Sequence, residues 1–139
     1  MKNKPLNIVL DTNIFLVAVP DTSPFNWIYN DLFHQKYNLF VSNDIIKEYE
    51  EQLKFRYDKK LADEILTALF LLPNVHFVNI YYNWNLISQD PDDNKFVDCA
   101  VASNAHYLVT HDKHYKVLKD IPIPKINVIK IDDFKKLLK

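Results

Sequence analysis

The chain has 139 residues, of which 48% are hydrophobic and 25% are charged, and its formal net charge at pH 7 is −1. This length and composition predict one globular domain over residues 1–139. The near-zero charge excludes a basic field over the whole surface, although it is compatible with a local basic rim. Glycine is absent, which excludes glycine-rich phosphate loops of the Walker and dinucleotide-binding types.

The single cysteine, Cys99, cannot form an intramolecular disulfide, which is typical of proteins in the reducing cytosol. No apolar run approaches the ~20 residues of a membrane span. The first residues also lack the apolar segment of a signal peptide. We therefore expect a cytoplasmic protein without a membrane partner.

Strand-like and helix-like patterns alternate along the chain. Short apolar runs typical of buried strands occupy residues 6–10, 39–41, 107–110 and 126–131, and residues 75–82 are rich in strand-forming residues. Between these runs, apolar residues recur at helical spacing in residues 25–33, 45–53, 61–72 and 96–105. A short basic helix at 113–119 and a terminal helix capped by Asp132 complete the series. The alternation predicts an α/β fold with a single, mainly parallel sheet.

The first predicted strand ends on Asp11, which is followed by Thr12 and Asn13. In open α/β sheets, ligands bind outside the carboxyl ends of the strands, so Asp11 lies where a ligand site is expected. The alternative is that Asp11 only caps the apolar helix that follows it.

A second acid of the site is expected on the helix after residues 39–41, for which Ser42 or Asn43 is the cap. Helical periodicity places Glu51 opposite the apolar stripe, with Glu48 and Glu50 at its two borders. This helix begins at the carboxyl edge of the sheet, so the earliest glutamate, Glu48, is favoured. The alternative for Glu48 is a solvated helix face.

Residues 90–112 combine a Pro-Asp-Asp-Asn turn, an apolar helical stripe and a β-branched strand that ends just before Asp112. Carboxylates at both ends of such a compact unit are unfavourable without a partner, and a shared cation is the simplest one. Asp11 and Asp112 would then both follow strands that look central in the sheet.

The order of these motifs resembles that of a PIN domain, and the resemblance extends over essentially the whole chain. It rests on Asp11-Thr12-Asn13 after a strand, a helix glutamate after a serine-capped turn, and Asp98 followed by Leu108-Val109-Thr110-His111-Asp112. It is closest to the toxins of VapC-like (PIN-type) toxin–antitoxin systems. The resemblance implies a three-layer α/β/α sandwich with a five-stranded sheet and an acidic pocket for Mg²⁺ or Mn²⁺. It also implies hydrolytic endonuclease activity on RNA, a cognate antitoxin and a homodimer.

The family has four acids that bind metal and take part in catalysis. The resemblance implies that the first, second and fourth of them, in chain order, are Asp11, Glu48 and Asp112. The expected position of the third acid falls on Asn94. We assign Asp98 as the third acid, because it lies about one turn along the same helix face and an unpartnered carboxylate is unfavourable among its apolar neighbours. Asp93 is the alternative, with helix capping as its competing role.

Other residues are expected to support these acids or to contact substrate. The supporting residues would be Asn13, Asp93, Asn94 and Thr110. A positive rim for an RNA backbone would come from Lys95, Lys113, His114 and Lys116. No cysteine pair accompanies the histidines, so a zinc site is not expected.

Two rival functions come from other classes. One is a haloacid-dehalogenase-like phosphohydrolase, whose Asp-x-Asp motif fails here because position 13 is asparagine. The other is a catalytically weak PIN-fold protein that acts as a binding partner or scaffold, a reading that Asn94 favours.

Overall fold

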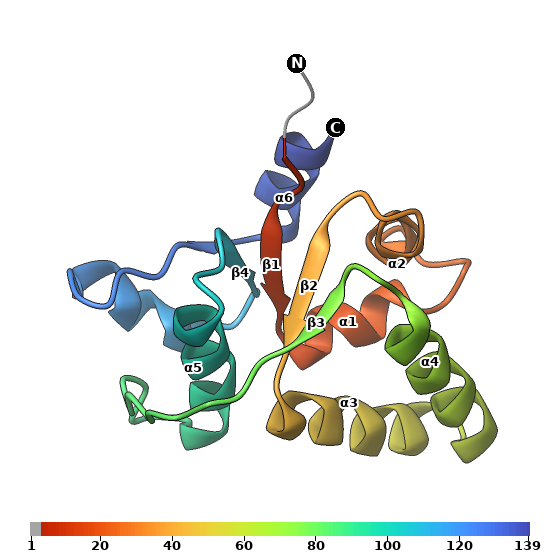
Figure 1. The fold of residues 1–139 in the computed structure, drawn as a ribbon, viewed down its shortest axis with the longest axis horizontal. Helices are drawn as coiled ribbons and strands as arrows, with labels where there is room; N and C mark the ends of the chain where they lie inside the picture. Colours follow the sequence, from red (N-terminus) through yellow and green to blue (C-terminus); the bar gives the residue numbers. More distant parts are fainter. Residues whose placement is uncertain (1–3) are drawn as a thin grey trace.

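The computed structural model describes residues 4–139, which form a five-stranded parallel sheet with helices on both sides (Figure 1). The strands have the order β3-β2-β1-β4-β5, and every neighbouring pair is parallel. Their bounds are β1 (Asn7–Leu10), β2 (Asn38–Val41), β3 (Val75–Phe77), β4 (Tyr107–Val109) and β5 (Val128–Ile129). This confirms the predicted fold class, an α/β sandwich built on a parallel sheet.

Parallel neighbours need crossover connections, and helices provide most of them. The α-helices are α1 (Thr12–Ala18), α2 (Asn26–Phe33), α3 (Asn43–Arg56), α4 (Lys59–Leu71), α5 (Asn94–Ala102) and α6 (Ile131–Leu138), of which α6 follows the last strand. The 3₁₀ helices are η1 (Pro91–Asp93) and η2 (Lys113–Asp120). Helix α5 packs on β1, β2 and β4, and Figure 1 shows α2 and α4 on the opposite side of the sheet. Within residues 4–139, no helix is long and apolar enough to cross a membrane.

The sheet is most deeply buried at β1. Ile8, Val9 and Leu10 have no exposed surface, because β1 has a strand on each side and helices over its faces. Burial of such aliphatic side chains contributes roughly 1.5–3 kcal/mol each. Leu10 pairs with Val109 of β4, so the two strands end side by side, as predicted for the runs before Asp11 and Asp112.

Helix α3 begins at this carboxyl edge and brings further side chains to it. Ser42 caps α3, with its hydroxyl accepting a hydrogen bond from the Ile45 N–H at 3.3 Å, so Ser42 rather than Asn43 is the cap. Tyr49, one turn and a half along α3, donates a 2.6 Å hydrogen bond to the Leu10 carbonyl. This bond fixes the start of α3 against the end of β1.

Some predicted elements differ from the structure at their ends. Only Val75–Phe77 of residues 75–82 form a strand, and the chain from there to η1 is an irregular loop. The basic segment after Asp112 is a 3₁₀ helix, and the last strand is limited to Val128–Ile129. The prediction that Asp132 caps the terminal helix was wrong, since Lys130 holds that position and Asp132 lies in the first turn. There its negative charge faces the positive end of the helix dipole.

Candidate metal centre

Asp11 lies directly after β1 and is only 6% exposed. It occupies the N-cap position of α1, but its side chain makes no capping hydrogen bond. Instead the Thr110 hydroxyl donates a 2.6 Å hydrogen bond to Asp11 Oδ2. Burial raises the pKa of Asp11, while the Thr110 hydroxyl and the Asn13 backbone N–H act in the opposite direction. The exposed Asn13 therefore contributes to the site through its backbone.

Thr110 also connects Asp11 to the fourth predicted acid. Its hydroxyl oxygen accepts a 3.0 Å hydrogen bond from the Asp112 N–H. Asp112 caps η2 by accepting a 2.9 Å hydrogen bond from the His114 N–H. Burial raises the pKa of Asp112, but the His114 N–H, Asp93 and the His114 ring outweigh it, so the net shift is downward.

Asp93 stands at the start of α5 and is 7% exposed. It is the N-cap residue of α5, yet its carboxylate makes no capping hydrogen bond, so the competing role that the sequence suggested for it is not observed. Burial raises the pKa of Asp93 to about 8, and the hydrogen bond and negative charge of Asp112 add to this rise. Tyr115 holds the Asp93 backbone by donating to its carbonyl at 3.3 Å.

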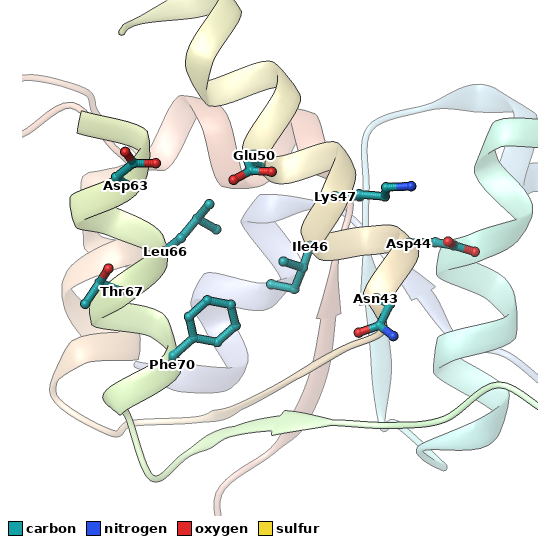
Figure 2. A pocket seen from close by; sticks show the side chains of 9 residues that line it. All are labelled: Asn43, Asp44, Ile46, Lys47, Glu50, Asp63, Leu66, Thr67 and Phe70. Atoms are coloured by element: carbon teal, nitrogen blue, oxygen red, sulfur yellow. The ribbon is translucent and has the colours of Figure 1, made fainter. Parts of the chain in front are cut away.

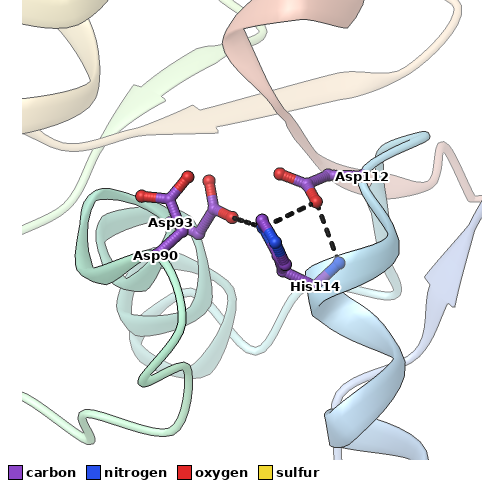
Figure 3. A group of neighbouring side chains, drawn as sticks. All are labelled: Asp90, Asp93, Asp112 and His114. Carbon is purple, nitrogen blue, oxygen red and sulfur yellow. Dashed lines mark hydrogen bonds and ion pairs between the residues drawn. The ribbon is translucent and has the colours of Figure 1, made fainter.

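Four side chains form what we call the acid group: Asp90, Asp93, Asp112 and His114 (Figure 3). Each offers one ligand atom, and these atoms lie within 4.8 Å of one another. His114 Nδ1 is 3.1 Å from Asp112 Oδ1 and 3.7 Å from Asp93 Oδ2. The sequence pattern indicated Asp93 as the alternative third acid and His114 as part of the substrate rim, and it marked the stretch from Asp90 to Asp112 without assigning Asp90 a role in the site.

The donor set of the acid group fits a divalent cation. Asp93 Oδ2 and His114 Nδ1 are both buried, and in the described part of the chain neither makes a hydrogen bond of normal geometry, although His114 Nδ1 lies at ion-pair distance from Asp112 Oδ1 (3.1 Å) and Asp93 Oδ2 (3.7 Å). Leaving such atoms unsatisfied costs about 1–3 kcal/mol each, and more for a charged group. Carboxylate oxygens suit Mg²⁺ and Mn²⁺, and an imidazole nitrogen is a further ligand that transition metals accept. A cation between Asp93, Asp112 and His114 would satisfy both buried atoms.

Glu48 reaches the same edge of the sheet from α3. Thr12 donates a hydrogen bond to Glu48 Oε2, and Lys95 donates one to Glu48 Oε1 at 2.7 Å. Thr12 directly follows Asp11, and the negative charge of Glu48 is the last of the contributions that raise the pKa of Asp11. The position of Glu48 near the start of α3 agrees with the reasoning that favoured it over Glu50 and Glu51. Glu50 instead pairs with Lys54 at 3.5 Å.

The structure does not bring Asp98 into the acid group. Asp98 Oδ1 accepts a 3.0 Å hydrogen bond from the Trp84 N–H, in the loop before η1. Burial raises the pKa of Asp98 and the Trp84 N–H lowers it, without a contribution from the other acids of the site. Asn94 is also engaged with this loop, because its side chain accepts from the Ile87 N–H at 2.9 Å and donates to the Ile87 carbonyl at 2.8 Å. Both residues thus hold the loop against α5.

A cleft of about 540 Å³ has Asp112 in one wall and a set of lysines around it, which we call the basic cleft. Its four lysines are exposed, and none is within ion-pairing distance of a carboxylate of residues 4–139; they are Lys113, Lys116, Lys119 and Lys130. His111 closes the cleft by accepting a 3.2 Å hydrogen bond from the Ile131 N–H at the start of α6. Lys95, which the sequence placed on the substrate rim, points instead to Glu48.

A larger hollow, of about 650 Å³, lies between α3 and α4 (Figure 2). Apolar Leu66 and Phe70 line it together with acidic Glu50 and Asp63. These two acids already pair with lysines on their own helices, one turn away. The hollow contains no member of the acid group, and its size alone does not make it the functional site.

Comparisons with known proteins agree with this fold. An uncharacterized protein of Methanocaldococcus jannaschii, MJ1680, is 32% identical over 126 aligned positions, which cover 86% of this chain and 79% of the relative. The structure of VapBC2 from Rickettsia felis bound to a promoter DNA fragment has a TM-score of 0.59 at 18% identity, over 90% of this chain and 98% of that chain. The structure of DNA-bound VapBC from Salmonella typhimurium has a TM-score of 0.52 at 13% identity, and it also covers 90% of this chain and 98% of that chain. The model of the PIN domain matches residues 7–114, and the chain therefore belongs to the PIN domain family.

Proposed function

We propose that this PIN domain is a metal-dependent endoribonuclease that hydrolyses RNA phosphodiester bonds. The observation that carries the proposal is the acid group, in which two buried ligand atoms without a hydrogen bond of normal geometry converge beside two further carboxylates. PIN domains as a family are nucleases, and an acidic donor set of this kind supports that chemistry here. The proposed ion is Mg²⁺ or Mn²⁺.

The residues have distinct roles in this proposal. Asp93 and Asp112 would hold the ion, and His114 and Asp90 would complete its surroundings. Asp11 adds a negative charge whose orientation is fixed by the Thr110 hydroxyl. When bound, the ion would neutralise the phosphoryl oxygens and lower the pKa of a water that attacks phosphorus. Asp93 replaces Asp98 as the third acid, because its carboxylate reaches the group whereas that of Asp98 faces Trp84.

The basic cleft supports RNA as the substrate. Its lysines begin next to Asp112 and continue along η2 to the start of α6. Ammonium groups without carboxylate partners are the groups that a phosphate backbone attracts, and this attraction needs no base sequence. Lys113 and Lys116 retain their proposed place on the substrate rim, and Lys119 and Lys130 extend it.

A toxin of a type II toxin–antitoxin pair is the proposed biological role. Two VapBC structures, both bound to DNA, share the fold of this chain, and its motifs resemble those of the toxins of VapC-like toxin–antitoxin systems. We propose a cognate antitoxin, a homodimer and a cytoplasmic place of action, where the lone Cys99 stays reduced. A small neighbouring reading frame whose product binds this chain and blocks cleavage would support the role; arrest of growth only in the absence of that product is the expected phenotype.

The biochemical test compares cleavage of one labelled single-stranded RNA with EDTA, Mg²⁺ or Mn²⁺. Cleavage is expected only with an ion, and Asp112→Asn should abolish it. Asp63→Asn is the matched control, because Asp63 lies in the hollow between α3 and α4 (Figure 2). Ion-independent cleavage, or equal cleavage by Asp112→Asn, would contradict the proposal. If the folded chain binds RNA but never cleaves it, the binding or scaffold function becomes the better account.

A further inference from the structure

Each carboxylate oxygen of Glu48 accepts a hydrogen bond from another element of the chain. Thr12, on α1, donates to its Oε2, and Lys95, on α5, donates to its Oε1 at 2.7 Å. The side chains of Lys95 and Glu48 are only 20% and 22% exposed. An acid that the family resemblance marks as a metal ligand is therefore already paired with a cation that belongs to the chain.

The Lys95–Glu48 pair lies beside the acid group without belonging to it. Glu48 raises the pKa of Asp11, and Asp11 in turn contributes to the raised pKa of Asp93. The negative charges thus form a series from Glu48 through Asp11 to Asp93 and Asp112. Lys95 neutralises one end of the series, and the buried atoms without a hydrogen bond of normal geometry, Asp93 Oδ2 and His114 Nδ1, lie at the other end.

A divalent ion at the Glu48 end would have to displace this ammonium. Mg²⁺ demands near-octahedral oxygen geometry, and each oxygen of Glu48 already accepts a hydrogen bond, one of them from the Lys95 ammonium. An ion that left Lys95 in place would lie within a few ångströms of another positive charge, in a partly buried site where water screens poorly. The two cations would therefore compete for the same carboxylate.

We infer that Lys95 takes the place of a second divalent ion, so that the chain binds one Mg²⁺ or Mn²⁺ at the Asp93–Asp112 end and uses the Lys95 ammonium as its second cation. This inference rests on the proposed metal-dependent function. An ammonium has three N–H donors, and one of them bonds Glu48. The other two are available to a non-bridging oxygen of the substrate phosphate. We therefore assign Lys95 to the interior of the site, whereas the sequence pattern placed it on the outer rim.

The test is the stoichiometry of Mn²⁺ binding to the metal-free chain, measured by calorimetry without RNA. Wild type should bind one ion. Lys95→Met should bind two, because Glu48 and Asp11 become available to a second ion, and its electron paramagnetic resonance spectrum should show a coupled Mn²⁺ pair. Lys95→Arg, which keeps the positive charge, should bind one. Lys60→Met is the matched control for loss of a lysine, since Lys60 is exposed on α4 and outside the acid group and the basic cleft, and it should also bind one.

Two results would overturn the inference: two ions bound by wild type, or one ion bound by a folded Lys95→Met chain. If Lys95→Met does not fold, Glu48→Gln replaces it as the test. Glu48→Gln should keep one ion at wild-type affinity, and a tenfold or larger loss would show that Glu48 ligates the ion and overturn the inference. If no variant and no wild-type chain binds Mn²⁺, the metal-dependent function itself fails, and the inference fails with it.

Discussion

Asp93 and Asp112 face each other across His114, and their pKa values shift in opposite directions (Figure 3). Burial, together with the neighbouring Asp112, raises the pKa of Asp93 to about 8. Burial also raises the pKa of Asp112, but the His114 N–H, Asp93 and the His114 ring lower it by more. At neutral pH, one carboxyl group therefore keeps its proton and the other is ionised, a division that a bound cation would remove.

The raised pKa of Asp93 predicts how the stability of the metal-free chain depends on pH. The folded-state pKa of about 8 lies above the ordinary value of 3.8, so the contribution of Asp93 is fully present below pH 3.8 and is lost as pH rises toward 8. Asp93→Asn should flatten this decline and be more stable than wild type at pH 8. Thermal unfolding of wild type and Asp93→Asn between pH 4 and 8 in EDTA measures this pH dependence of stability. An unchanged pH profile in Asp93→Asn would show that another group causes the decline.

Thr110 is expected to act through the two acids that it connects. Thr110→Val removes the hydroxyl that donates to Asp11 and accepts from the Asp112 N–H. By analogy with other residues that orient metal ligands, we expect a loss of about 10- to 100-fold in Mn²⁺ affinity. Thr110→Ser keeps the hydroxyl and should retain most of the affinity. Calorimetry measures both variants, and equal affinity in Thr110→Val and wild type would contradict this role.

Asn94 is expected to stabilise the fold by holding the loop before η1. Asn94→Ala leaves the N–H and carbonyl of Ile87 without their present partners in a buried position. The expected cost is about 1–3 kcal/mol in the free energy of unfolding. Denaturant unfolding measures the loss. Asn83→Ala, an exposed position in the same loop, is the control and should be nearly neutral; a loss of equal size there would contradict the specific role of Asn94.

The basic cleft is expected to hold RNA through its phosphates. Lys116→Gln and Lys119→Gln should each weaken binding of a single-stranded RNA in EDTA without changing sequence preference. The slope of the logarithm of the binding constant against the logarithm of salt concentration should fall by about 0.7 for each phosphate contact removed. Lys60→Gln, an exposed position on α4, is the control. Unchanged slopes in both cleft variants would place the RNA elsewhere.

The parts of the site that follow strand ends could be predicted from the sequence. Buried parallel strands appear as short apolar runs, so Asp11 and Asp112 were placed correctly at the carboxyl edge. The same reasoning about position along a helix that favoured Glu48 also favours Asp93 over Asp98. Asp98 lies five residues further into α5, or about 7.5 Å along its axis, away from the edge at which α5 begins.

Other features depend on contacts between distant segments and have no sequence signal. The carboxylate of Asp98 is satisfied by the N–H of Trp84, in a loop without regular secondary structure. Lys95 meets Glu48 across 47 positions of sequence. Periodicity describes which face of a helix is buried, but it does not say which backbone group or ammonium a polar side chain will meet there.

The most direct test of the metal centre is a comparison of Asp93→Asn and Asp98→Asn in Mn²⁺-dependent cleavage of a single-stranded RNA. If Asp93 holds the ion, Asp93→Asn should lose about a hundredfold or more of the cleavage rate, because a bound ion is worth several kcal/mol of transition-state stabilisation. Asp98→Asn should stay within a few-fold of wild type, since its carboxylate serves the loop at Trp84. Full activity in Asp93→Asn together with a hundredfold loss in Asp98→Asn would contradict the account.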